Sequence, residues 1–446
     1  MIFHNERLLD FVQFEYQAET LRSLQTFLQG QGVFQLPILA NGLFPAAAVS
    51  ATTAYTGYAS VWVRDNVYLA YSHYIRGQTA IAVKTAQGLM RYFQKHRWRF
   101  EKIINHQADP NDVMQRPHVR FNGQTLTEID QPWQHAQNDA LGYFLWFYSL
   151  LVNANAIALQ PSDLEVLALF ALYFEAIAYW QDLDSGHWEE ARKISATSIG
   201  TVVAALNAFR SIWQRWQTNV GGVNPALSVA TLDSLIAKGE TALAAILPAE
   251  CIQPAPQGRR YDAALLFLIY PLQIVSDAMA DEILAAVITH LQGNYGVRRY
   301  LNDSFWCRNY QDLPENIRTT LSRDREQWLS QQGRRLTLGE EAQWCLFDPI
   351  LSAIFGLKFQ RDRQPQWRQQ QTHYFNRALG QLTGDDCPQG ALKCPELYYL
   401  QNGQYIANDA TPLLWTQANL QIAFALLQQS LEASPPKIPF SPPPTE

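Results

Sequence analysis

The sequence predicts an all-α protein, and three observations lead to this fold class. Apolar residues recur at helical spacing along most of the 446 residues, and no strong alternating pattern typical of β-strands competes with them. About twelve helical segments are joined by loops rich in Pro, Gly, Asn and Asp, which suggests antiparallel helix pairs. Such pairs could form a solenoid, a bundle or a closed ring. Because no fixed-period repeat is present, the solenoid is disfavoured, and a closed helical barrel is the favoured architecture.

Local patterns place the individual helices. Leucines recur at helical spacing in the first segment. Ser162-Asp163 precedes the apolar run that begins at Leu164, and Thr411-Pro412 places a capping residue before proline at the first helical position. In chain order, we expect helices at residues 6–29, 64–76, 78–104, 136–157, 161–180, 196–216, 228–247, 261–270, 279–293, 324–332, 339–357, 364–380 and 412–430.

Length and composition bear on the domain organisation. Length alone would favour two or three domains, although closed barrels often exceed the average domain size as single units. With 48% hydrophobic and 17% charged residues, the chain has ample material for a large core. We expect a single barrel domain at residues 1–432. Residues 433–446, with Ser434-Pro435-Pro436 and Ser441-Pro442-Pro443, are typical of an extended proline-rich tail.

The charge balance limits the possible partners. The net charge is −6, the sequence pI is about 5.9, and no cluster of Lys and Arg is present. Nucleic acid and anionic membranes are therefore unfavourable partners, and a neutral ligand fits better. Five cysteines without a CxxC pair argue against a disulfide framework, and the N-terminus shows no export signal. We expect a cytoplasmic protein.

The sequence gives no sign of a metal or a cofactor. His135 and His187 lack the i, i+4 spacing of a metal-binding helix, and ordinary hydrogen-bonded roles are expected for both. Neither a phosphate-loop pattern nor G-x-S-x-G occurs, so nucleotide binding and serine hydrolysis lack support. We expect no metal and no cofactor.

Two short acidic segments are the strongest candidates for chemistry. They are His187-Trp188-Glu189-Glu190 and Pro395-Glu396-Leu397, far apart in the sequence. Cleavage of a glycosidic bond by acid and base needs one protonated and one ionised carboxyl, which requires different surroundings for the two groups. The alternative interpretation is that both glutamates are solvated surface groups, as most are.

Other polar residues stand next to aromatic ones at the ends of apolar helices. A sugar pocket needs this combination, because rings cover the CH faces of the sugar while polar groups bond its hydroxyls. Helix caps and surface salt bridges are the alternative for any one segment. The residues singled out as candidates are Arg64, Asp65, Trp133, Arg299, Asp303 and Glu341.

From Leu43-Phe44-Pro45 to Leu414-Trp415-Thr416, the chain resembles glycoside hydrolase family 15, the glucoamylase-type enzymes. It resembles even more closely the N-terminal domain of the phosphorylase kinase α and β regulatory subunits, as in Ser195-Ala196-Thr197-Ser198 and Thr411-Pro412-Leu413. The resemblance implies an (α/α)6 barrel with its pocket at the N-terminal ends of the inner helices. Glucoamylases differ from this chain at Gly186-His187 and around Glu396.

The resemblance also implies roles for single residues. Glu189 corresponds to the general acid and Glu396 to the general base of an inverting exo-α-glucosidase acting on glycogen-like or maltooligosaccharide-like α-glucans. The two carboxyl groups should then stand about 6.5 to 9.5 Å apart, leaving room for the attacking water. Glu190 is expected to support rather than react, its charge helping to keep the proton on Glu189. The residues expected to bind substrate are Arg64, Asp65, Trp133, Trp188, Glu190, Arg299, Asp303 and Glu341.

A second class of function follows from the kinase-subunit resemblance. Such a protein would keep the helical ring and the sugar pocket but act as a non-catalytic, carbohydrate-sensing regulator of a protein partner. Hydrolysis of α-linked glucosides distinguishes the two hypotheses, because only the enzyme turns them over.

Overall fold

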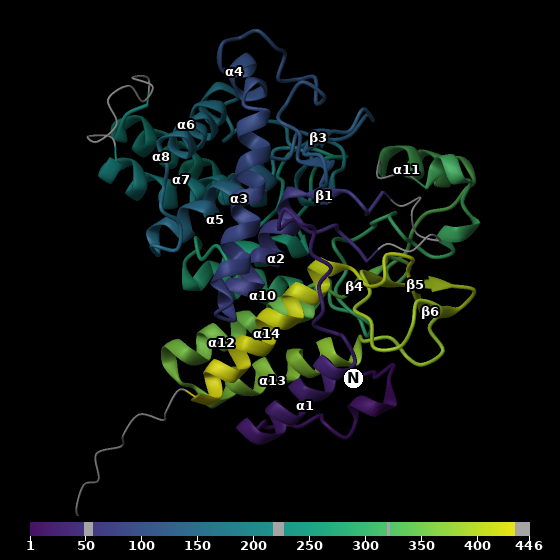
Figure 1. Cartoon of the computed structure of the whole chain (residues 1–446). Coiled ribbons are helices and arrows are strands. Elements are labelled where there is room, and N and C mark those ends of the chain that lie inside the picture. Colours follow the sequence, from purple (N-terminus) through teal and green to yellow (C-terminus); the bar gives the residue numbers. More distant parts are fainter. Residues whose placement is uncertain (49–56, 217–226, 319–321, 433–446) are drawn as a thin grey trace, which may run out of the picture.

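Six inner helices close a ring in the computed structural model, which describes residues 1–48, 57–216, 227–318 and 322–432. Each inner helix packs against the next one along the chain, and the last returns to the first, so that α14 lies beside α2 (Figure 1). The inner helices are α2 (Val63–Ile75), α5 (Asn138–Asn153), α7 (Ala196–Trp216), α9 (Leu266–Ile269), α12 (Phe347–Asp362) and α14 (Leu414–Glu432).

Six outer helices surround this ring. The contacts place α1 on α14, α3 on α2, α6 on α5, α8 on α7, α10 on α9 and α13 on α12, and α3, α6 and α13 each contact a second inner helix as well. This arrangement is the expected (α/α)6 barrel, and α4 (Trp98–Ile104) and α11 (Ser322–Gln331) are added outside it. The outer helices are α1 (Ala18–Gly30), α3 (Thr79–Lys95), α6 (Pro161–Ala176), α8 (Val229–Ile246), α10 (Asp277–His290) and α13 (Pro365–Gly380).

The inner helices are apolar around most of their circumference because they are covered on all sides. In α5, 14 of the 16 residues are buried. A helix with this composition is stable only inside a larger core, whereas an amphipathic helix such as α3 suits the outer layer. Gly142 lets α5 approach α7 closely, since a Cβ at this position would lie 3.0 Å from Cγ2 of Thr201.

Two small antiparallel sheets stand at the end of the barrel where the inner helices begin. The first has the order β1 (Val61–Trp62), β2 (Arg120–Asn122) and β3 (Thr127–Glu128). The second has the order β4 (Gln343–Trp344), β5 (Leu397–Gln401) and β6 (Gln404–Ala407), and pairs Trp344 with Leu397. The sequence did not predict these strands, because segments of two to five residues are too short for an alternating pattern.

The largest departures from the expected helix bounds are at three places, and the helix expected at 261–270 is also shortened to Leu266–Ile269 after a 3-10 turn. The single helix expected at 78–104 is divided into α3 and α4, because His96 leaves helical geometry at φ −111° and ψ 21°. The helix expected at 6–29 begins only at Ala18, after a 3-10 turn at Glu6–Leu8. The helix expected at 339–357 begins at Phe347, since the residues before it enter β4. The expected tail at 433–446 lies outside the described residues.

Candidate active site

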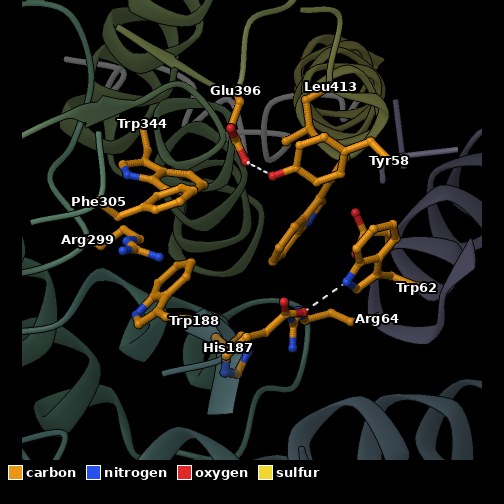
Figure 2. A pocket seen from close by; sticks show the side chains of 13 residues that line it. Tyr58, Trp62, Arg64, His187, Trp188, Arg299, Phe305, Trp344, Glu396 and Leu413 are labelled. Atoms are coloured by element: carbon orange, nitrogen blue, oxygen red, sulfur yellow. Dashed lines mark hydrogen bonds and ion pairs between the residues drawn. The ribbon is translucent and has the colours of Figure 1, made fainter. Parts of the chain in front are cut away.

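A cavity opens at the N-terminal ends of the inner helices (Figure 2). It encloses about 590 Å³, counting the part open to solvent. Its walls come from the start of α2, the turn before α7, strand β4, the segment before β5 and the start of α14. The lining residues are Tyr58, Trp62, Arg64, Asp65, His187, Trp188, Glu189, Arg299, Phe305, Trp344, Glu396, Leu413 and Trp415.

Glu189 occupies an unusual backbone position at the end of the 3-10 turn Gly186–Trp188. Its φ of 57° and ψ of 37° fall in the left-handed region, which costs an L-residue other than glycine roughly 1–2 kcal/mol. Its Oε1 accepts hydrogen bonds from Nε1 of Trp62 at 3.0 Å and from Arg64 at 3.3 Å. Burial raises the pKa of Glu189, although the guanidinium groups of Arg64 and Arg120 oppose this shift.

Glu396 stands directly before β5 and is 3% exposed. The hydroxyl of Tyr58 donates to its Oε1 at 2.9 Å, and the side-chain amide of Asn408 donates to its Oε2. Burial raises the pKa of Glu396 to about 7, and these two hydrogen bonds limit the rise because they stabilise the ionised form. The carboxyl is therefore close to half-ionised at neutral pH.

The two carboxyl groups belong to opposite walls of the same cavity. In Figure 2, Glu396 and Tyr58 lie across the cavity from Arg64, which donates to Glu189. The negative charge of Glu189 raises the pKa of Glu396. Since ionisation of one group hinders ionisation of the other, there is a pH range in which the pair holds one proton between them.

A third carboxyl, Asp65, lines the cavity from the first turn of α2. Burial raises its pKa to about 7, and the charges of Glu189 and Glu396 act in the same direction, while neighbouring Arg64 opposes them. A partly protonated acid at this place can both donate and accept hydrogen bonds, which suits a sugar hydroxyl.

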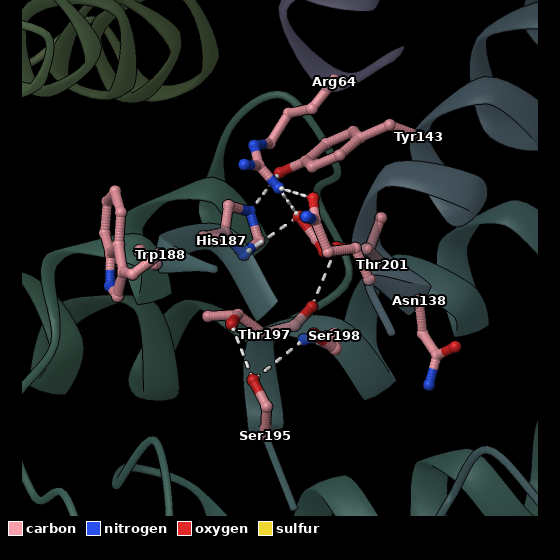
Figure 3. A network of polar contacts seen from close by, with 12 residues as sticks. Arg64, Asn138, Tyr143, His187, Trp188, Ser195, Thr197, Ser198 and Thr201 are labelled. Atoms are coloured by element: carbon pink, nitrogen blue, oxygen red, sulfur yellow. Dashed lines mark hydrogen bonds and ion pairs between the residues drawn. The ribbon is translucent and has the colours of Figure 1, made fainter. Parts of the chain in front are cut away.

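A buried network holds Arg64 in the cavity wall (Figure 3). Arg64 donates to Asp139 at 2.6 Å, and Nδ1 of His187 lies 3.4 Å from the same carboxylate. Burial lowers the pKa of His187 to about 3, so its ring is neutral, and its Nε2 lies 3.1 Å from the hydroxyl of Tyr143. Burial alone would raise the pKa of Asp139, but the charge and the hydrogen bond of Arg64 lower it. Asp139 therefore stays ionised and fixes the guanidinium beside Glu189.

Arg299 is held by carboxylates behind an aromatic wall. It donates to Asp303 at 2.6 Å and to Glu190 at 3.1 Å, and its Cζ lies 5.1 Å from the ring centre of Trp188. Glu190 also binds Arg259 at 3.0 Å. Burial alone would raise the pKa of Glu190, but the two arginines lower it to about 2. Glu190 is therefore ionised, and its charge is balanced by two guanidinium groups.

The structure brings six of the ten candidate residues together in the cavity lining and places four outside it. The six are Glu189, Glu396, Arg64, Asp65, Trp188 and Arg299. Trp133 packs edge-on against Trp62, with ring centres 6.1 Å apart. Asp303 and Glu190 hold Arg299 from behind. Glu341 accepts hydrogen bonds from the backbone amides of Asn302 and Gly339, both at 2.9 Å.

Sequence reasoning missed several lining residues, most of them aromatic. Trp62 and Trp415 stand next to segments that were singled out, so proximity to those motifs was the available signal. Tyr58 carried no signal, because its value lies in a contact with Glu396 across 338 positions of sequence. Trp344 also lines the cavity, and the indole N–H groups of Trp344 and Trp415 are buried without a hydrogen-bond partner among the described residues.

Within the described ranges, no group of three or more His, Cys, Asp or Glu side chains is arranged to hold a metal ion. No helix in the part of the chain that the structure describes combines the length and the apolar character needed to cross a bilayer.

Residues 33–383 match glycosyl hydrolases family 15, and the chain belongs to this family. Among curated relatives, the probable phosphorylase b kinase regulatory subunit alpha of Drosophila melanogaster is 27% identical over 353 residues, covering 73% of this chain and 25% of the relative. The skeletal muscle isoform of the alpha subunit from Oryctolagus cuniculus is 27% identical over 277 residues, covering 55% of this chain and 21% of the relative. The chain thus spans about a quarter of the length of these relatives.

Solved structures share the fold. A glycosidase in complex with glucose has a TM-score of 0.60 at 16% identity, covering 96% of this chain and 99% of that one. A glucoamylase from Saccharomycopsis fibuligera has a TM-score of 0.59 at 13% identity, covering 92% of this chain and 96% of the glucoamylase chain. At such low identity, these similarities establish the (α/α)6 barrel and not the activity.

Proposed function

We propose that this protein is a glucoamylase-like, inverting exo-α-glucosidase that releases glucose from glycogen-like or maltooligosaccharide-like α-glucans. The observation that carries this proposal is a pair of carboxyl groups in the lining of one cavity with aromatic rings. Glu396 is buried and lies across the cavity from Arg64, and the partly buried Glu189 accepts a hydrogen bond from Arg64. Membership of glycosyl hydrolases family 15 supports it.

In the proposed reaction, protonated Glu189 gives its proton to the leaving glycosidic oxygen. Ionised Glu396 takes a proton from a water that attacks the anomeric carbon from the opposite face. Tyr58 and Asn408 orient the base by their hydrogen bonds. We expect a carboxyl separation of about 6.5 to 9.5 Å, as an inverting mechanism requires.

The other candidate residues bind the sugar or position residues that bind it. Arg64, Asp65 and Arg299 hold the hydroxyls of the first sugar in this proposal, with the ring of Trp188 covering a CH face and Trp133 flanking the cleavage point. Three further acidic residues position their neighbours and do not contact the sugar in this proposal. Glu190 and Asp303 hold the guanidinium of Arg299, and Glu341 holds the backbone amides of residues 302 and 339.

We further propose that residues 1–432 form one domain, and that the protein works in the cytoplasm. The inner ring supports the single domain, because it closes only when α14 packs on α2. All five cysteines lie within the described residues and none forms a disulfide, which agrees with a reducing compartment.

The proposal is tested by incubating the purified protein with a panel of α-linked glucosides and following the anomeric configuration of the released glucose by NMR. We expect β-glucose as the first product. Glu189→Gln should abolish turnover while maltose binding persists, because the amide keeps the shape but supplies no proton. The matched control is Glu175→Gln, an exposed position on α6. Turnover unchanged in Glu189→Gln would discard Glu189 as the acid.

A second function is favoured by one observation, the 27% identity with the phosphorylase b kinase regulatory subunit alpha. In this reading, the chain is a non-catalytic, carbohydrate-sensing regulator with a protein partner. It predicts maltose binding in calorimetry without hydrolysis of any glucoside in the panel.

A further inference from the structure

A second cavity lies on the other side of the Glu190 ion pairs. It is bounded by the segment 256–261, by residues 300–302, and by α11 with the segment 334–336 that follows it. The cavity encloses about 1360 Å³, counting the part open to solvent, and shares no lining residue with the active-site cavity. In Figure 1, α11 lies at the edge of the molecule, away from the outer helices α1 and α13.

This second cavity is lined by four arginines and one carboxylate, Glu326. Arg259 is already paired, with Glu190 at 3.0 Å and Asp262 at 3.2 Å. The other three arginines form no ion pair among the described residues. They are Arg260, Arg334 and Arg335. Arg260 and Arg335 are exposed, and Arg334 is half-buried and donates to the backbone oxygen of Arg308 at 3.2 Å. With Glu326 as the one carboxylate in the lining, these arginines leave an excess of positive charge around a cavity open to solvent, which favours a small anion with more than one negative charge.

The remaining lining residues indicate which organic group would carry the anion. The ring of Tyr261 is stacked on His290 at 4.1 Å, and the ring of Tyr300 lies 3.4 Å from the guanidinium of Arg259. Leu329 and Leu336 complete an apolar side. Rings and leucines offer a surface for a sugar or a base, while planar arginine forks bind phosphate oxygens in pairs. The combination fits an organic phosphate monoester better than a bare inorganic anion.

Glu190 connects the two cavities. Two residues of the second cavity contact its carboxylate, Arg259 by an ion pair and Tyr300 by a hydroxyl hydrogen bond. The same carboxylate binds Arg299, which lines the active-site cavity. An anion that draws Arg259 toward itself weakens the pair between Arg259 and Glu190, so that Glu190 binds Arg299 more strongly. This rearrangement changes the placement of Arg299.

We propose that the second cavity binds an organic phosphate monoester, and that its occupancy changes ligand affinity in the active-site cavity through Arg259, Glu190 and Arg299. The coupling rests on the proposed function, because it assumes that the first cavity binds sugar. Phosphate binding in the second cavity does not depend on that assumption.

Binding is measured by titration calorimetry on the full chain at constant ionic strength, with glucose 6-phosphate, AMP and inorganic phosphate as probes. Binding of either ester supports the site, and the stronger of the two tells a sugar from a nucleotide. The double variant Arg334→Ala/Arg335→Ala should weaken ester binding at least about tenfold, since charge-assisted hydrogen bonds are lost. The control is Arg22→Ala, an exposed arginine on α1.

Three results overturn the binding site. They are no binding of either ester, equal binding by wild type and the double variant, or an equal loss in Arg22→Ala. Inorganic phosphate that binds as tightly as both esters overturns the role given to the tyrosine rings.

The coupling is measured as the maltose dissociation constant with and without saturating ester. We expect a change of at least about fivefold in the wild type and none in Arg334→Ala/Arg335→Ala. Ester binding without any effect on maltose binding overturns the coupling alone. Ester binding in a protein that binds no maltose contradicts the proposed function and leaves the second site standing.

Discussion

Replacing Tyr58 with phenylalanine removes one hydroxyl that donates to Oε1 of Glu396 at 2.9 Å, and it leaves the ring in place. This hydrogen bond stabilises the ionised carboxylate and therefore lowers the pKa of Glu396. A hydrogen bond to a charged group contributes about 1.5–3 kcal/mol, and one pKa unit corresponds to about 1.4 kcal/mol. Because water in the cavity replaces part of the lost bond, we expect the pKa to rise by about one unit from its value of about 7.

The sign of the effect on turnover follows from the role proposed for Glu396. A general base works only when ionised, so its pKa sets the acidic limb of the pH profile of kcat/KM. At about pH 6, the ionised fraction falls from roughly a tenth to roughly a hundredth when the pKa rises from about 7 to about 8. The Tyr58→Phe variant should therefore lose about tenfold in kcat/KM at this pH, and much less above about pH 9.

The assay follows glucose release at low substrate concentration from about pH 5 to pH 9. Tyr405→Phe is the matched control, because this hydroxyl also donates a hydrogen bond, to the backbone oxygen of Gly339 at 3.0 Å, but Tyr405 lies outside the cavity lining. A limb that stays in place while activity falls equally at every pH would refute the link between Tyr58 and the ionisation of Glu396.

Three further predictions concern stability and are measured by denaturant unfolding. Gly239→Ala should destabilise by about 1–3 kcal/mol, because a Cβ there would lie 2.1 Å from the Tyr179 hydroxyl between α8 and the barrel, whereas Gly30→Ala, with open space around it, should not. Arg116→Met should cost about 3–5 kcal/mol, since it leaves Asp182 without the buried arginine that binds both its oxygens at 2.6 and 2.7 Å; recovery in the double variant Arg116→Met/Asp182→Leu tests this cause. Glu189→Gly should be more stable than Glu189→Gln by about 1 kcal/mol, as glycine relieves the left-handed backbone at φ 57°; the opposite order would remove the claim of strain.

The helices were predictable because their signal is local. The pattern that predicts α5 lies within its own sixteen consecutive residues, whereas the position of β4 depends on its pairing with β5, more than fifty positions away. Local propensity and periodicity contain no information about such a distant pairing partner. This explains why the helix expected at 339–357 began too early.

Residues of the candidate site could be predicted from the sequence only where their type and neighbours are uncommon outside such sites. A glutamate next to Trp188 and an Arg-Asp pair at a helix start are informative by themselves. The charge state of each carboxyl group cannot be predicted in this way, because it depends on which arginine pairs with which acid in the folded chain. Glu190 stands beside Glu189 in the sequence, yet it faces Arg259 and Arg299 and has a pKa of about 2, while burial raises the pKa of Glu189.

The site carries a free-energy cost that the proposed function explains. Holding Glu396 at a pKa of about 7 instead of 4.5 destabilises the folded state at neutral pH by about 3 kcal/mol. This cost disappears as the pH falls below about 4.5, where the carboxyl is protonated in both the folded and the unfolded state. The left-handed backbone of Glu189 adds roughly 1–2 kcal/mol. Rings and neutral donors suffice to bind a sugar, so binding alone requires neither the left-handed backbone of Glu189 nor the raised pKa of Glu396. In the proposed reaction, acid and base catalysis needs both carboxyl groups in these places, and this need accounts for the cost.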